Sequence, residues 1–300
     1  MARWFVSLTR LILSVLVCAG SSALAASTAK DLANDLFRHD SSLGAETKPI
    51  GARLESMLSD EVLVPTSDFA RGLEQAIPAL QGGPLNKVSK WTWQPVLVGL
   101  SADAQHGFTA GFQRHVLTDG TKRRAKYLAY WIRVDDAWRI KAYRIVPVAS
   151  GKPDERRLPD LLPATIKAPT PAETSEHRIT LSASEKAFSN RAQAIGLRLA
   201  FTEFGRSDSI NLGGSVTGEF VRGAEAIAAL VAQGEPVQGS SVHWDADEAT
   251  TVASSGDLGV TFGFIRFHEP TSGTTKPTAI PFFTVWKKDG PDRPWRYVAE

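Results

Sequence analysis

The chain of 300 residues is almost neutral, with 34 lysines and arginines, 32 aspartates and glutamates and a formal net charge of +2 at pH 7. This balance gives no indication of a nucleic-acid partner or of binding to an anionic membrane surface. Hydrophobic residues make up 43% of the chain, so the composition is that of a globular protein, and the length indicates one or two domains.

The first 25 residues have the pattern of a secretory signal peptide. Two arginines precede an apolar run over residues 11–19, and small residues then lead to an A-x-A cleavage site at Ala23-Leu24-Ala25. The run is shorter than the roughly 20 apolar residues that cross a bilayer. We therefore predict cleavage near Ala25, which gives residues 1–25 as the signal peptide. The mature protein is then periplasmic or secreted, without stable membrane insertion; the alternative is an uncut N-terminal anchor.

Cys18 is the single cysteine of the chain and lies within this segment. The predicted mature protein then has no thiol, which excludes disulfide bonds, a cysteine nucleophile and cysteine-based metal sites. Its fold is expected to depend on core burial alone.

The first half of the remaining chain begins with helical patterns and continues with strands. Residues 28–39 and 51–58 have apolar residues at helical spacing. In the phrase FARGLEQAI, at residues 69–77, Gly72 suits a turn out of an extended segment, and Glu74 then lies in the first turn of a helix, where a carboxylate is favourable. Strand patterns complete this half at residues 91–101, 106–117, 124–134 and 137–148.

A proline-rich segment separates the two halves. Six prolines lie between Pro147 and Pro171, and each removes a backbone donor and favours an extended chain. We therefore predict a first domain over residues 26–148, a linker over 149–178 and a second domain over 179–300. Three leucines can pack this linker on a neighbouring domain: Leu158, Leu161 and Leu162.

The second half repeats the order of the first. A broad helical pattern covers residues 184–204, and the phrase FVRGAEAI at residues 220–227 places Gly223 and Glu225 in the same relation as the glycine and glutamate of the first copy. Strand patterns follow at residues 242–254, 259–269, 278–288 and 294–300. Helices followed by antiparallel strands in each half predict an α+β fold.

The two halves also share individual residues in the same order, which indicates a duplication. Phe69 and Phe220 have the same separation as Trp93 and Trp244. Further matched pairs are Gly107 with Gly259, Gly111 with Gly263, Phe112 with Phe264, Arg114 with Arg266, Trp131 with Trp286 and Trp138 with Trp295. We therefore predict two tandem domains of one fold.

The phrases FVRGAEAIAAL, SGDLGVTFGF, FFTVWKKDG and WRYVAE of the second half resemble the SnoaL-like domains of the nuclear transport factor 2-like superfamily. More narrowly, they are similar to a branch of unknown function in exported bacterial proteins, and the first half is a divergent copy. The resemblance implies a cone-like domain in which a strongly curved antiparallel sheet is wrapped by N-terminal helices and opens over a pocket. It does not imply one reaction, because relatives include ketosteroid isomerase, polyketide cyclases, dehydratases and pure binding or dimerising modules.

Several catalytic motifs are absent from the sequence. There is no G-x-S-x-G, G-x-x-x-x-G-K, G-x-G-x-x-G or H-E-x-x-H pattern, so nothing supports nucleotide hydrolysis, dinucleotide chemistry or zinc peptidase activity. We predict no cofactor and no metal site.

The polar cluster VHWDADE offers weak candidates for catalysis. His243 and Asp245 can pair an imidazole with a carboxylate for proton transfer, and Asp257 is a third polar candidate in this half. The alternative is an exposed polar face of a strand, which is ordinary in antiparallel sheets.

A second group of residues has the composition of a ligand site. Arg114 and Arg266 lie on the same strand face as Phe112 and Phe264, and a cation beside aromatic rings can orient an anion; the alternative is a strand end that reaches solvent. Aromatic residues of the last long strands can line a pocket or fill the core: Trp131, Trp286 and Phe282.

We interpret the protein as a non-catalytic module that binds a small apolar or anionic molecule or associates through its sheets, within the chain or as a homodimer. The alternative is an isomerase, cyclase or dehydratase that uses a carboxylate or histidine in one pocket. Among the matched positions, only Glu74 and Glu225 can act as a general base. Their place in the first turn of a helix is already explained by the helix dipole, which argues against a catalytic acid or base inherited by both halves. The resemblance to ketosteroid isomerase is weakened because the second half has a single tyrosine, Tyr297.

Overall fold

The computed structural model describes residues 28–43, 50–82, 88–148, 153–170, 174–215, 217–268 and 279–300. The predicted signal peptide at residues 1–25 lies outside the described residues. Among the helices of the described ranges, none combines the length and apolarity needed to span a membrane.

The first domain contains three helices and a six-stranded sheet in the order β2-β1-β6-β5-β4-β3. The predicted helix and strand patterns each correspond to an element. The elements in chain order are α1 (Ala29–Ser42), α2 (Ile50–Met57), β1 (Leu58–Pro65), β2 (Phe69–Arg71), α3 (Gly72–Gly82), β3 (Val88–Leu100), β4 (His106–Leu117), β5 (Lys122–Val134) and β6 (Ala137–Val148).

The second domain repeats this arrangement, with the sheet order β8-β7-β12-β11-β10-β9. The prediction of an α+β protein made of two tandem domains is confirmed. The elements are α4 (Thr174–Ile195), α5 (Leu197–Phe204), β7 (Gly205–Asn211), β8 (Val221–Arg222), α6 (Ala224–Val231), β9 (Val242–Val252), β10 (Leu258–Phe267), β11 (Ala279–Lys287) and β12 (Arg296–Ala299).

Each sheet is mixed rather than purely antiparallel, which refines the sequence prediction. One pair of strands in each sheet is parallel, β1 with β6 and β7 with β12, and the other pairings are antiparallel. The strands β1 and β7 follow directly after helices and return to the far end of the meander. Because their partners are distant in sequence, the local pattern of apolar residues did not reveal the parallel pairing.

The repeated Arg-Gly-x-Glu phrase forms the predicted strand-to-helix hinge in both domains. Gly72 has φ +67° and begins α3, and Gly223 has φ +84° and precedes α6. A Cβ atom at either glycine would lie 3.1 Å from a backbone oxygen, that of Asp60 or that of Ser207. Glycine is therefore required here for its backbone conformation.

The broad helical pattern of residues 184–204 is split into two helices. Gly196, with φ +88°, ends α4 and serves as the N-cap of α5. A Cβ atom there would lie 2.5 Å from the backbone oxygen of Val237. The break lets α4 and α5 cover the same face of the second sheet.

The proline-rich segment packs along the edge of the first sheet over residues 153–170. The backbone amides of Leu158 and Leu161 donate to the carbonyls of Val96 and Val98 on β3, over 2.6 Å and 2.8 Å. Helix α4 begins at Thr174, inside the range assigned to the linker, because no proline follows Pro171 in this region.

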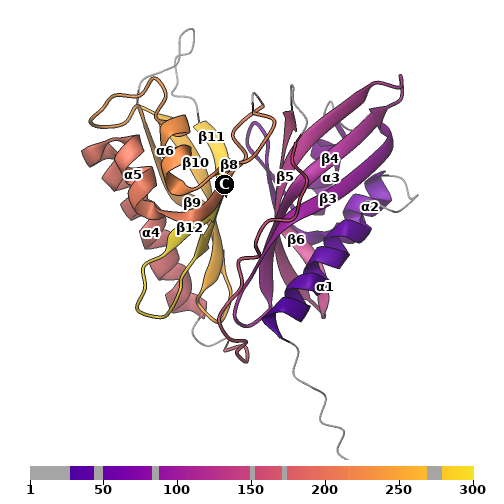
Figure 1. The fold of residues 1–300 in the computed structure, drawn as a ribbon, viewed down its shortest axis with the longest axis horizontal. Coiled ribbons are helices and arrows are strands. Elements are labelled where there is room, and N and C mark those ends of the chain that lie inside the picture. The colour runs from indigo at the N-terminus through magenta and orange to yellow at the C-terminus, as the bar shows by residue number, and fades with distance from the viewer. Residues whose placement is uncertain are drawn as a thin grey trace, which may run out of the picture.

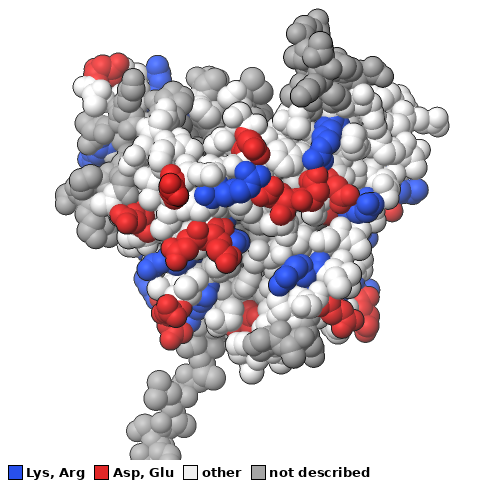
Figure 2. All heavy atoms as spheres, turned by 180° about the vertical axis from the view of Figure 1, so that it is seen from behind, with Lys and Arg blue, Asp and Glu red and all other residues white. Residues whose placement is uncertain are grey.

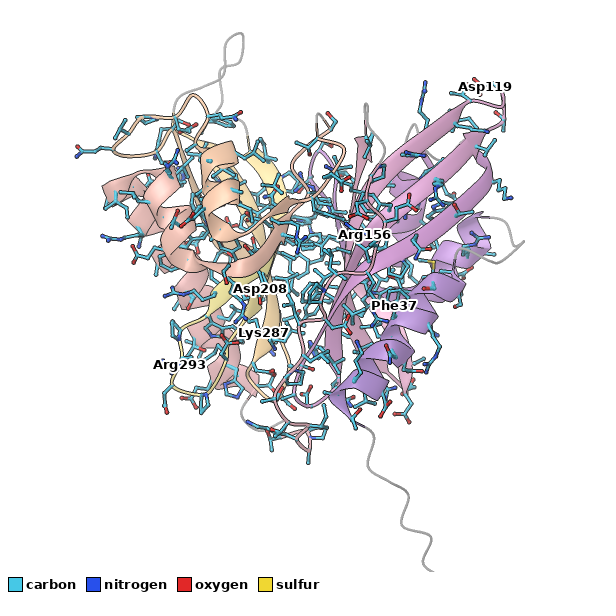
Figure 3. The ribbon with its side chains drawn as sticks, in the orientation of Figure 1. Phe37, Asp119, Arg156, Asp208, Lys287 and Arg293 are labelled. Atoms are coloured by element: carbon cyan, nitrogen blue, oxygen red, sulfur yellow. The ribbon has the colours of Figure 1, made fainter. Side chains whose placement is uncertain are left out.

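The two sheets face each other across the middle of the molecule, and the helices lie on the outer sides (Figure 1). One hydrophobic cluster contains residues of both domains, among them Phe69, Phe112, Phe220 and Phe262. The side chains that fill this space are drawn in Figure 3. The domains therefore share a core and pack as an intramolecular pair.

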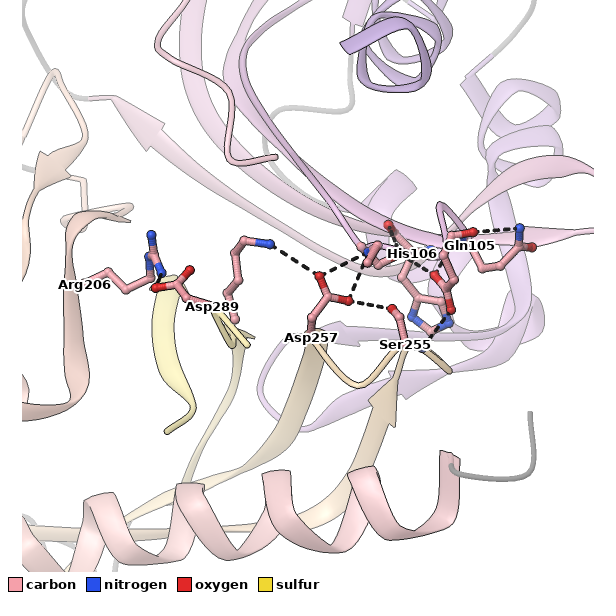
Figure 4. A network of polar contacts seen from close by, with 10 residues as sticks. Gln105, His106, Arg206, Ser255, Asp257 and Asp289 are labelled. Carbon is pink, nitrogen blue, oxygen red and sulfur yellow. Dashed lines mark hydrogen bonds and ion pairs between the residues drawn. The ribbon is translucent and has the colours of Figure 1, made fainter. Parts of the chain in front are cut away.

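The turns that join β3 to β4 and β9 to β10 cross between the domains (Figure 4). Asp103 accepts hydrogen bonds from the hydroxyl of Ser254 and the amide of Ser255, over 2.8 Å and 3.1 Å. Asp257 accepts from the amide of Ala102 over 3.0 Å, and its carboxylate lies 3.6 Å from the amine of Lys287. These exchanged contacts fix the orientation of one sheet on the other.

Candidate functional site

A cavity of about 390 Å³ lies in the second domain, between its sheet and the helices that cover it. Its wall combines apolar side chains from α4, α5, α6 and the strands with a few polar groups. The apolar residues used below are Phe188, Phe201, Val231, Trp244, Ile265 and Phe282, and the polar ones are Arg144, Glu185, Asn211 and Glu300.

Aromatic rings on the two helices pack on the sheet and form much of the apolar wall. The ring of Phe188 on α4 lies 4.7 Å from that of Phe201 on α5 and 4.9 Å from that of Trp244 on β9, measured between centroids. Both contacts are edge-to-face, the arrangement that aromatic pairs favour. These rings therefore form one packed side of the cavity.

Glu185 on α4 is a fully buried carboxylate at this wall. One oxygen accepts from the indole N–H of Trp244 over 2.7 Å, and the other accepts from the indole of Trp286 over 2.9 Å and from the hydroxyl of Thr261. Burial raises the pKa of Glu185 to about 7, and the three hydrogen bonds act in the opposite direction. The carboxyl group joins the helix to three strands of the sheet.

A second carboxyl group, Glu300, follows β12 at the other side of the cavity. Its oxygen accepts a hydrogen bond from the side-chain amide of Asn211 on β7 over 3.1 Å. Burial raises the pKa of Glu300 to about 7, with the neighbouring charge of Glu185 acting in the same direction. Both carboxyl groups therefore titrate near neutral pH.

Arg144 reaches this cavity from the first domain. It lies on β6, whose neighbouring residues Tyr143 and Ile145 pack in the core of the first domain. Because side chains alternate along a strand, Arg144 and Val146 leave the opposite face of β6, and both line the cavity of the second domain. Burial lowers the pKa of Arg144, and the charge of Glu300 acts in the opposite direction.

The first domain holds a related buried carboxyl group at Asp40 on α1. The hydroxyl of Tyr127 donates to Asp40 over 2.7 Å, and the indole of Trp131 donates to Thr109 over 2.8 Å, as its counterpart Trp286 donates to Thr261. Burial raises the pKa of Asp40 to about 7. Each domain thus has a buried acid on its first helix, whereas the matched sequence positions had indicated only Glu74 and Glu225.

Large aromatic side chains pack closely in the interior of the first domain. Trp93 lies 4.6 Å from Tyr127 and 5.5 Å from Tyr143 between ring centroids. Trp131 is fully buried in the same cluster. Trp131, a candidate ligand-binding residue, therefore lies in the core cluster of the first domain.

The predicted ligand-binding residues of the second domain do not lie at one common site. Phe282 lines the cavity, and Trp286 lies behind the wall with its indole on Glu185. Phe264 is at the domain interface, where its ring lies 5.3 Å from that of Phe69. Arg266 pairs with Asp247 and covers the ring of Phe264, so these two do not belong to the cavity wall.

Arg114 lies in a separate groove of the first domain, with a volume of about 700 Å³. Its guanidinium forms an ion pair with Glu155 of the linker. The same groove is lined by four further cationic side chains: Lys90, Lys122, Arg123 and Arg124. On the opposite side of the molecule from Figure 1, basic and acidic side chains are mixed (Figure 2).

The three candidate catalytic residues do not converge on the cavity. Along β9, Val242 and Trp244 line the cavity, so the alternating His243 and Asp245 leave the other face. His243 stacks on His268 at 4.9 Å, and Asp245 pairs with Lys186 at 3.2 Å. Asp257 lies at the domain interface, as Figure 4 shows.

Sequence reasoning missed the polar groups of the cavity: Arg144, Glu185, Asn211 and Glu300. A signal for Glu185 was present, because it lies one turn before Phe188 on the apolar stripe of a helix, where a charged residue is uncommon. No comparable signal existed for Arg144. In the described ranges, no group of three or more histidine, cysteine, aspartate or glutamate side chains is arranged to hold a metal ion.

No protein-family model and no curated protein matches the chain. Solved structures do match, each at low sequence identity and with a TM-score near 0.3. A nuclear transport factor 2-like superfamily protein from Salmonella enterica serovar Typhimurium LT2 is 15% identical, with a TM-score of 0.30, over 41% of this chain and 93% of that one.

Two further matches cover similar shares of this chain. An NTF-2 like protein of unknown function from Shewanella oneidensis MR-1 is 10% identical, with a TM-score of 0.30, over 39% of this chain and 97% of that one. Hexachlorocyclohexane dehydrochlorinase LinA-type3 from Novosphingobium barchaimii LL02 is 16% identical, with a TM-score of 0.28, over 43% of this chain and 96% of that one. Each of these proteins therefore corresponds to less than half of this chain.

Proposed function

We propose that this protein is an exported ligand-binding protein whose second domain holds a small, largely apolar molecule. The observation that carries the proposal is the cavity of about 390 Å³ between aromatic and aliphatic side chains. Small-molecule sites are concave, mostly apolar and roughly 300–1,000 Å³ in volume, with a few polar groups that fix orientation. The cavity has this size and composition.

Binding without turnover is favoured by the state of Glu185. Both carboxylate oxygens already accept hydrogen bonds from two indoles and a hydroxyl, so the carboxyl group is held in place by the protein itself. His243 and Asp245 leave the face of β9 that is opposite to the cavity, so they do not complete an acid–base set. The first domain, in which Trp93, Tyr127 and Tyr143 pack against one another, acts as the structural partner of the second domain.

A second candidate function is proton transfer of the isomerase or lyase kind. It is favoured by one observation, namely that two carboxyl groups beside the cavity, Glu185 and Glu300, have pKa values near 7. A general base works best with a pKa near the working pH. Turnover of isomerase or dehydratase substrates that is lost in Glu185→Gln or Glu300→Gln would replace the binding proposal with this one.

The binding proposal is tested by fluorescence titration with N-phenyl-1-naphthylamine, a neutral apolar probe. We expect saturable binding to the parent protein and strong loss of binding in Val231→Trp, which places an indole in the cavity wall. Val237→Trp adds the same ring at a side chain that is 91% exposed and is the matched control. Equal binding by the parent and Val231→Trp would reject the cavity as the site.

Export is proposed on the pattern of residues 1–25. Mass spectrometry of the protein recovered from the periplasm or medium is expected to find a chain that begins at Ala26. A chain that retains Met1, or a lipid on Cys18, would contradict the proposed cleavage.

A further inference from the structure

Arg144 is the cationic group of the cavity wall, and it belongs to the other domain. Its strand, β6, is paired with β5 in the first sheet, where Leu128 is opposite Arg144. The side chain crosses the interface between the domains and enters the wall that Phe188, Trp244 and Phe282 form. Removal of the first domain would therefore leave this cavity without its cation.

The guanidinium of Arg144 has no ion pair or hydrogen bond within the described part of the chain. Two other arginines of the described residues have acidic partners. Arg71 binds Glu248 at 2.7 Å, and Arg206 binds Asp208 at 2.8 Å and also pairs with Asp289. A partly buried guanidinium with free donors is costly, because removal from water is not repaid by a partner.

Glu300 is the acidic residue whose charge raises the pKa of Arg144, but its carboxylate does not contact the guanidinium directly. No ion pair joins these two described residues, and an oxygen of Glu300 is engaged by the amide of Asn211. Five N–H donors in a planar fork match the two oxygens of a carboxylate. The geometry thus leaves a cation facing an apolar cavity with room for an anionic head group.

We propose that Arg144 recognises the anionic head of the ligand, so that the second domain binds amphipathic monoanions with an apolar body and a carboxylate-like group. This inference rests on the proposed function, since it assigns the ligand class of the same cavity. The site is then shared by the two domains: the second supplies the apolar wall and the first supplies the charge.

Glu300 makes this recognition depend on pH. Three other polar side chains line the same cavity: Arg144 of β6, Glu185 of α4 and Asn211 of β7. Burial raises the pKa of Glu300 to about 7. Below that pH the carboxyl group is neutral and does not repel an anion, whereas above it the negative charge competes for Arg144. Anion binding is therefore expected to weaken as the pH rises from 6 to 8.

The test compares two probes that differ by one charge. N-phenyl-1-naphthylamine is neutral, and 1-anilinonaphthalene-8-sulfonate has the same ring system with a sulfonate. We expect the parent protein to bind the sulfonate probe more tightly than the neutral probe at pH 6. Arg144→Leu should lower the affinity for the sulfonate probe about tenfold or more and change the affinity for the neutral probe less than threefold.

The matched control is Arg114→Leu, which removes a cation from the basic groove of the first domain. If the sulfonate probe loses affinity in Arg114→Leu and not in Arg144→Leu, the anion site is the groove, and the inference is overturned. If Arg144→Leu lowers the affinities for both probes equally, Arg144 has a packing role, and the inference is also overturned. A parent that binds the neutral probe and not the sulfonate probe rejects the inference alone, whereas failure of both probes rejects the proposed function.

The pH arm uses Glu300→Gln, which keeps the shape of the side chain and removes its charge. The affinity of the parent for the sulfonate probe should fall between pH 6 and pH 8, and this fall should become smaller in the variant, in which Glu185 still titrates near pH 7. A fall of the same size in both proteins would exclude Glu300 from the site.

Discussion

The amine of Lys126, on β5 of the first domain, donates a hydrogen bond of 2.8 Å to the backbone oxygen of Thr217 in the second domain. Three further oxygens lie within hydrogen-bond distance of the amine and share its remaining N–H groups: the hydroxyl of Thr217 and the backbone oxygens of Gly214 and Glu219. Lys126 is fully buried, and burial lowers its pKa to about 8. One side chain of the first domain therefore holds the loop whose glycines, Gly213 and Gly214, line the cavity.

Lys126→Met is expected to lower the free energy of unfolding by about 1–3 kcal/mol, because it leaves buried carbonyl groups without a donor. It should also weaken binding of the neutral probe, since the loop of the cavity wall loses its anchor. Urea unfolding and fluorescence titration measure the two effects. Lys122→Met, at the exposed start of the same strand, is the control, and equal effects of both substitutions would contradict the role of Lys126.

Glu185→Gln is expected to change how stability depends on pH. The pKa of Glu185 is about 7 in the folded protein and lies near 4.5 when the chain is unfolded. Between these values the folded state binds more protons, so the contribution of Glu185 to stability is full below pH 4.5 and is lost as the pH rises through 7. The free energy of unfolding of the variant, relative to the parent, should therefore rise between pH 4.5 and pH 8 by on the order of 3 kcal/mol.

Asp40→Asn offers an internal comparison for this experiment. Burial raises the pKa of Asp40 to about 7 as well, so the change relative to the parent should have the same sign. Urea unfolding at several pH values measures both variants. If the free energy of unfolding depends on pH in the same way in the variants and in the parent, the raised pKa values of these carboxyl groups are contradicted.

Gly223→Val is expected to lower the free energy of unfolding of the protein by about 1–3 kcal/mol. The backbone of Gly223 has φ +84°, and a Cβ atom would lie 3.1 Å from the oxygen of Ser207. Gly82→Val, at a glycine with no neighbouring atom within 4 Å of a Cβ, is the control. Thermal unfolding that is identical for Gly223→Val and the parent would show that the hinge does not need glycine.

Asp257→Ala is expected to cost about 3 kcal/mol of stability, because it leaves the amine of Lys287 and the amide of Ala102 without their carboxylate at the domain interface. Asp289→Ala removes a surface partner of Arg206 and should cost less than about 1 kcal/mol. Calorimetry compares the two variants. If the loss in Asp257→Ala does not exceed that in Asp289→Ala, the crossed turns do not hold the domains together.

The sequence alone determined the features that depend on local pattern or on comparison of the two halves. Gly72 and Gly223 were identified because a positive φ favours glycine at each copy of one phrase. The strand patterns around Trp131 and Trp286 located the long strands, since alternation of apolar residues is a local property. The duplication and the α+β fold follow from these observations.

Only the tertiary structure decided which side chains meet. Glu185, Thr261 and Trp286 lie on three elements far apart in the sequence, and Arg144 enters a cavity of the other domain because the two sheets pack face to face. Such contacts depend on the relative placement of elements, and strand alternation shows the face of a residue but not what covers that face. The same limit applies to His243 and Asp245. Their spacing predicted that they share one face of a strand, but the tertiary structure places that face opposite to the cavity.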